Sequence, residues 1–107
     1  MKNYKVNLLQ SALDDLEEIV LFISSDNRNR AIIWKNELMK KIYALSLFPQ
    51  MGTLVPDKKM SSIGFRMFPF GNYIVFYIIF EQQEEITVLR ILNAKRDYPR
   101  MFENLIE

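Results

Sequence analysis

Four ionic side chains lie close together near the C-terminus of the 107-residue chain, within and just beyond an apolar run. The run extends from Val88 to Asn93 and contains one cation, Arg90. It is followed at once by the other polar groups of the tract: Lys95, Arg96, Asp97 and Tyr98. Burying an unpaired guanidinium inside an apolar strand is prohibitive. Arg90 therefore indicates an exposed or ion-paired patch of a sheet. If side chains alternate along this strand, Val88, Arg90 and Leu92 share one face.

Arg66 is a second cation within an apolar segment. If the strands of Arg66 and Arg90 belong to one antiparallel meander, both arginines can lie near Lys95 and Arg96. They would form a basic concavity with Tyr73, Tyr77 and Phe68 nearby, a surface that suits phosphates and bases.

Taken alone, the two arginines favour a structural interpretation over a binding surface. Arg90 can pair with Asp97 or Glu85, and Arg66 can be an edge-strand charge that discourages aggregation.

The composition excludes several kinds of chemistry. The chain contains no cysteine and no histidine. It therefore has no thiolate nucleophile, disulfide, iron–sulfur ligand or imidazole base. With three glycines it has no glycine-rich phosphate loop, and the acids of the first helix are spaced for a helix start rather than for metal ligation. We expect neither a cofactor nor a metal. The formal net charge is only +1, from 14 Lys and Arg against 13 Asp and Glu.

Apolar periodicity predicts an α+β fold with helices in one run and strands in another. Residues 4–8 alternate as a strand, and an acidic helix begins at Ser11 and ends at Ser24. A basic helix follows from Asn29 or Arg30 to about Leu47, so that the two form an antiparallel hairpin.

The second half of the chain has an extended period. Residues 50–62 are expected to be a loop, and three strands at 64–68, 73–80 and 86–93 form an antiparallel meander joined by turns at 69–72 and 81–85. Tyr98 and Pro99 open a short terminal helix that extends to residue 106.

The length fits a single domain over residues 1–107. No segment is long and apolar enough to span a membrane, and the first residues lack the apolar run of a signal peptide. We therefore expect no membrane association and a cytoplasmic location.

The order and spacing of certain residues resemble the RelE/ParE family of bacterial toxins, particularly its ParE-like members. The resemblance covers nearly the whole chain, and its best single mark is the Arg-Asp pair after the last strand. It rests on these residues: Ala12 to Leu16, Ala31, Trp34, Leu45, Pro49, Gly52, Arg66, Gly71, Tyr73, Tyr77, Leu89 to Leu92, Arg96 and Asp97.

The resemblance implies the toxin of a type II toxin–antitoxin pair, neutralised by a cognate antitoxin, with a possible higher-order toxin–antitoxin assembly. ParE-like members poison DNA gyrase, whereas RelE-like members cut mRNA on the ribosome. This chain has Ile74 where RelE-like nucleases look to carry arginine, Asn93 where related sequences often have histidine, and Phe102 where a catalytic tyrosine is expected. These departures favour the gyrase hypothesis.

Three functions therefore remain: a gyrase poison, a ribosome-dependent mRNA endoribonuclease, and a non-catalytic protein-binding module. Under the first, the resemblance implies target-binding residues Arg66, Tyr77, Arg90, Asn93, Arg96 and Asp97. Under the second, the candidate catalytic residues are Arg66, Arg90, Lys95, Arg96 and Tyr98.

Overall fold

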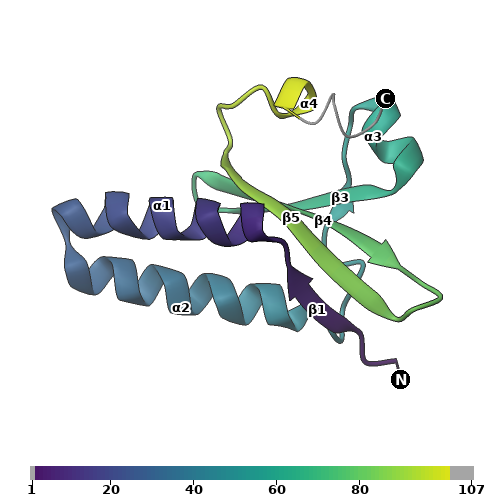
Figure 1. The fold of residues 1–107 in the computed structure, drawn as a ribbon, viewed down its shortest axis with the longest axis horizontal. Coiled ribbons are helices and arrows are strands. Elements are labelled where there is room, and N and C mark those ends of the chain that lie inside the picture. Colours follow the sequence, from purple (N-terminus) through teal and green to yellow (C-terminus); the bar gives the residue numbers. More distant parts are fainter. Residues whose placement is uncertain (1, 102–107) are drawn as a thin grey trace.

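A five-stranded sheet forms the centre of the molecule (Figure 1). The structure is a computed structural model, and it describes residues 2–101. The strand order is β1-β5-β4-β3-β2, with bounds β1 Lys5–Leu8, β2 Thr53–Leu54, β3 Phe65–Phe70, β4 Tyr73–Phe80 and β5 Glu85–Asn93. The predicted meander is confirmed as β3-β4-β5, with antiparallel pairs throughout. The N-terminal strand joins it by pairing parallel to β5.

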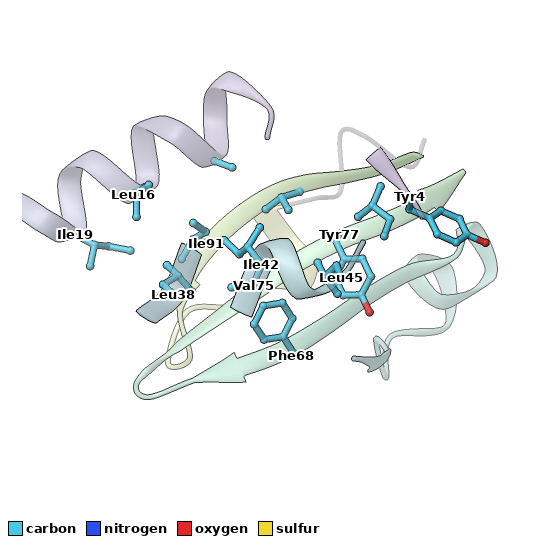
Figure 2. Close-up of a cluster of buried hydrophobic side chains, with 13 residues drawn as sticks. Tyr4, Leu16, Ile19, Leu38, Ile42, Leu45, Phe68, Val75, Tyr77 and Ile91 are labelled. Atoms are coloured by element: carbon cyan, nitrogen blue, oxygen red, sulfur yellow. The ribbon is translucent and has the colours of Figure 1, made fainter. Parts of the chain in front are cut away.

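A helical hairpin covers one face of this sheet. Helices α1 (Gln10–Asp26) and α2 (Arg28–Ala44) run antiparallel, and their far end projects beyond the strands (Figure 1). Figure 2 shows their apolar stripes gathered against the sheet, with Leu16, Ile19, Leu38 and Ile42 facing Val75, Tyr77 and Ile91. The predicted hairpin and its apolar seam are confirmed. No helix within residues 2–101 is long and apolar enough to cross a membrane.

Both helices begin earlier than predicted, and Ser11 does not cap α1. Helix α1 begins at Gln10, and Leu9 precedes it without a side-chain cap. The hydroxyl of Ser11 instead donates a hydrogen bond to the Leu89 carbonyl of β5, 2.8 Å away. Helix α2 begins at Arg28, earlier than predicted, because the Asn27 side chain caps it by accepting from the Arg30 amide.

The segment predicted as a loop at 50–62 contains structure, so that prediction is wrong. It holds the two-residue strand β2 and most of helix α3 (Lys58–Ile63). Asp57 caps α3 by accepting from the Met60 amide, and Gly64 ends it at φ +99°. A helix of this length is too short to show periodicity in the sequence.

A second apolar cluster lies on the face of the sheet away from the hairpin. Its buried members are Val55, Met60, Phe65, Phe76 and Leu92. Helices α3 and α4 (Tyr98–Met101) lie on this side (Figure 1). The predicted terminal helix is present over 98–101, and its remainder to residue 106 lies outside the described residues.

The β3–β4 connection is tighter than the predicted turn at 69–72. Strand β3 continues to Phe70, which pairs with Tyr73, so Gly71 and Asn72 alone make the turn. Gly71 adopts φ +59°, as the first central position of a type II′ turn requires. Pro69 is tolerated within β3 because β2 pairs only with Arg66 and Met67, which leaves the outer edge free at the proline.

The side chain of Tyr77 joins the loop that follows α2 to the sheet. Tyr77 is fully buried. Its hydroxyl accepts from the Gly52 amide at 3.0 Å and donates to the Pro49 carbonyl at 2.7 Å. A side chain at Gly52 would place its Cβ 2.4 Å from the Met67 carbonyl oxygen, so only glycine fits there. In this structure Tyr77 supports the fold, and the expected contact with a target stays a prediction.

Replacing Tyr77 by phenylalanine is expected to destabilise the fold. The change leaves the Gly52 amide and the Pro49 carbonyl without their partner, at a cost of about 1–3 kcal/mol. Each kcal/mol lowers the Tm of a chain of this size by roughly 4–8 °C, measured by thermal unfolding. Tyr43→Phe is the matched control, since Tyr43 is half exposed. Equal Tm values for the two variants would contradict this role.

Candidate functional site

A β-bulge interrupts strand β5 at the tract that the sequence singled out. Phe76 pairs with Arg90, but the next residue of β4, Tyr77, pairs with Val88. Leu89 is therefore the extra residue. Beyond the bulge, Ile91 returns to the helix-facing cluster with Val88, while Leu92 lies in the opposite cluster. The predicted alternation, with Val88 and Leu92 on one face, is wrong for this reason.

The carboxylate of Asp15 on α1 closes the bulge. It accepts from Arg90 Nε at 2.7 Å and from Arg90 Nη2 at 2.9 Å. It also accepts from the Ile91 backbone amide at 2.9 Å. The Asp15 and Arg90 side chains are 11% and 27% exposed, so solvent screens this ion pair only partly. The hydrogen bond to Asp15 raises the pKa of Arg90, although partial burial opposes that effect.

The two arginines have separate structural partners and do not form the expected basic concavity. Arg90 is ion-paired, as one interpretation proposed, but its partner is Asp15 rather than Asp97 or Glu85. Arg66 is half buried, and its Nη2 donates to the Gly52 carbonyl at 2.6 Å. Arg66 therefore supports the same loop as Tyr77 and is not an exposed edge charge.

A cleft of about 270 Å³ lies between α1 and the end of the sheet, and we call it the α1–β5 cleft. The helix contributes Asp15, Glu18, Ile19 and Phe22, and the strands and the following segment contribute Tyr73, Ile91, Leu92, Asn93 and Arg96. Two predicted residues, Asn93 and Arg96, thus share one site. Sequence reasoning missed Phe22, which lies off the apolar stripe of α1 and is 72% exposed. The position of Phe22 off the apolar stripe is the feature of the sequence that could have identified it as exposed.

Lys95 and Tyr98 lie away from the cleft. Lys95 lines a separate hollow of about 220 Å³, the turn hollow, formed with Gly71, Asn72, Asn93 and Ala94. The Tyr98 ring packs on Phe76 in the second cluster, with ring centroids 4.9 Å apart. Asp97 is exposed. Of the residues proposed for a ribonuclease, Arg96 thus lines the cleft, Lys95 lines the turn hollow and Tyr98 packs in the second cluster.

No metal site is apparent among residues 2–101. In that part of the chain no three Asp or Glu side chains lie together in a way that could hold an ion.

A comparison with protein families shows which family the chain belongs to. The model of the ParE toxin of the type II toxin–antitoxin system parDE matches residues 6–98. The chain belongs to the ParE toxin family. A search of curated protein sequences gave no match.

Solved structures share the fold of this ParE-family chain. The toxin–antitoxin complex RelBE2 from Mycobacterium tuberculosis contains a chain 18% identical, with a TM-score of 0.63 over 85% of this chain and 98% of that one. The chromosomal ParDE toxin–antitoxin system from P. aeruginosa contains one 16% identical, with a TM-score of 0.67 over 84% and 95%. The predicted RelE/ParE-like α+β architecture is confirmed.

Removing the Asp15 carboxylate from this ParE-family chain is expected to destabilise it. Asp15→Ala leaves Arg90 and the Ile91 amide without their acceptor, so we expect a loss of about 2–3 kcal/mol in the free energy of unfolding. Asp14→Ala is the matched control on the same helix turn. Asp14 is exposed and accepts only from the Gln10 side chain, so this change should cost less than about 0.5 kcal/mol.

Urea unfolding of both variants measures the difference. If the Asp15 variant is as stable as the Asp14 variant, the carboxylate does not join the hairpin to the sheet in solution.

Proposed function

We propose that this ParE-family toxin inhibits bacterial growth by acting on DNA gyrase. The observation that carries the proposal is the scatter of the residues that a ribonuclease would need to bring together. Arg66 donates a hydrogen bond to the Gly52 carbonyl, and Arg90 forms an ion pair with Asp15. Tyr98 packs in the cluster on the opposite face from the hairpin. The gyrase activity of ParE-like toxins, which the family relationship implies, requires no such constellation.

The chemistry of RNA cleavage explains why this scatter matters. Attack by a 2′-hydroxyl needs a base, an acid and cations around the same phosphate. In residues 2–101 the candidate proton donors Lys95 and Tyr98 lie in different environments, one at the turn hollow and one against Phe76. The far face of the sheet, between α3 and α4, is apolar. These features support a binding surface rather than a nuclease site.

The α1–β5 cleft is the proposed contact surface for the target. It combines an exposed aromatic ring, Phe22, with the polar groups of Asn93 and Arg96. Arg96 makes no ion pair within the described residues, so its charge is available to a partner. Asp97 beside it completes the proposed set. Arg66, Tyr77 and Arg90 support this set through the fold and do not contact the target.

Purified protein is expected to inhibit gyrase supercoiling, and Arg96→Ala should weaken that inhibition about tenfold, as loss of one interfacial arginine would. The variant should keep the wild-type Tm, because the Arg96 side chain has no partner within the described residues. Supercoiling assays with trapping of cleaved DNA provide the measurement.

Arg28→Ala, at the exposed end of the hairpin, is the matched control and should inhibit gyrase as the wild type does. New message ends after induction, mapped by primer extension on translating ribosomes, would instead establish an endoribonuclease. Inhibition unaffected by Arg96→Ala would remove the cleft from the proposal. Harmless overexpression would favour a binding module that is not a toxin.

We also propose that a cognate antitoxin neutralises this chain by laying an acidic amphipathic helix on the outer side of α2. That side exposes Ile32, Ile33 and Tyr43, which are each more than half exposed. Lysines at positions 35, 40 and 41 accompany them, with Glu37 as the nearby acid. Apolar anchors within a basic surface fit a helix of opposite charge.

Ile33→Asp is expected to weaken capture of the antitoxin encoded beside the gene at least tenfold, because it puts a carboxylate on the apolar contact. Co-purification and titration calorimetry measure the effect. Gln83→Asp, in the exposed β4–β5 turn, adds the same charge elsewhere and should leave affinity unchanged. Equal affinity for both variants would place the antitoxin on another surface.

A further inference from the structure

We propose that the turn hollow is a phosphate site that holds one backbone phosphate of duplex DNA. The inference deepens the proposed function and rests on it for the source of the DNA, since gyrase acts on a duplex. It concerns a direct contact between this chain and nucleic acid, separate from the protein contact at the α1–β5 cleft.

Backbone hydrogen bonds hold the wall of the turn hollow in place. The Ala94 amide donates to the Asn72 carbonyl at 2.8 Å, which ties the end of β5 to the β3–β4 turn. The Arg96 amide donates to the Asn93 carbonyl at 3.0 Å, which closes a tight turn after the strand. Gly71 presents no side chain, so a ligand can approach the backbone there. The volume of about 220 Å³ leaves room for a phosphate group.

Three donor groups around the hollow lack partners within the described residues. Lys95 forms no ion pair there, and the Asn72 side chain makes no hydrogen bond. The Asn93 carbonyl oxygen Oδ1 accepts from the Lys95 backbone amide at 2.9 Å, which leaves the Asn93 NH₂ group as a donor. One ammonium and two carboxamides can together satisfy the oxygens of a phosphodiester.

The turn hollow and the α1–β5 cleft differ in charge, so they favour different ligands. Carboxylates of Asp15 and Glu18 line the α1–β5 cleft, and they would repel a phosphate. No carboxylate lines the turn hollow. Asn93 lies between the two sites and belongs to both. An anion is therefore directed to the hollow.

A duplex fits this site better than a free phosphate ion does. One exposed lysine and two amides give a free ion little binding energy. A duplex presents further phosphates to other cations of the same segment, and Arg100, five residues after Lys95, is exposed. Binding by several such contacts is strongly dependent on salt.

Fluorescence anisotropy with a short labelled DNA duplex, at several NaCl concentrations and without gyrase, tests the site. Lys95→Gln is expected to weaken binding about threefold to tenfold and to reduce the slope of log K against log salt by about one. Lys5→Gln, exposed on β1 at the opposite end of the sheet from Asn93, is the matched control and should bind as the wild type does. Both variants should retain the wild-type Tm.

Wild-type protein that binds no duplex, or equal binding by wild type and Lys95→Gln, overturns the phosphate site. So does competition by inorganic phosphate at the same concentration as the duplex phosphates, which would assign the hollow to a free ion. A Lys95-dependent preference for single-stranded RNA over the duplex also overturns it.

The failure of the gyrase proposal gives a different result. Lys95-dependent duplex binding without any gyrase inhibition leaves the phosphate site intact and removes the proposed target.

Discussion

The contact of the Asp15 carboxylate with strand β5 is the interaction on which the rest of the structure depends. Three donors from two adjacent residues, Arg90 and Ile91, converge on this one side chain. A bulge exposes a backbone amide that the ladder no longer pairs, and an unpaired buried amide is costly. Asp15 satisfies that amide and neutralises the arginine at once. The bulge in turn lets Val88 and Ile91 face the hairpin while Leu89 and Leu92 face the other cluster.

The distribution of charge over the molecule depends on which cations form contacts within the fold. Arg66 and Arg90, the two arginines within strands, are engaged by a carbonyl and a carboxylate of the fold. The exposed cations of residues 95–100 come after the end of β5, and their side chains are not part of the core. The division between structural and available cations therefore coincides with the end of the strand. Near-neutral net charge conceals this local separation.

The sequence predicts the longer elements of the fold well and the short or compensating ones poorly. Periodicity over many residues identifies α1, α2 and the meander, and the order of motifs indicates the family. The bulge cannot be recognised in the sequence, because the tract around Leu89 is apolar on both sides of it. A strand with or without the extra residue would therefore bury apolar side chains on both faces. The partner of Arg90 is 75 residues away in the chain, and several acids compete for it.

The candidate site was predicted only in part for the same reason. Asn93 and Arg96 were found because they follow the strand directly, and the structure brings them into one cleft. Phe22 was missed because its exposure depends on how far the hairpin projects past the sheet. The burial of Tyr77 was not predicted, because a tyrosine in a strand has no local mark that separates a buried hydroxyl from an exposed one.

The parallel pairing of β1 with β5 also determines when the molecule can form. Lys5–Leu8 pairs with Glu85–Val88, so β1 cannot complete its pairing until β5 has been synthesised. Contacts between such distant segments form late and slow the folding of a domain. The α1–β5 cleft needs both α1 and the end of β5, so it cannot exist while the ribosome still holds that strand. Its surface therefore arises only after β5 has left the ribosome, and a chain cut short before Asn93 lacks it.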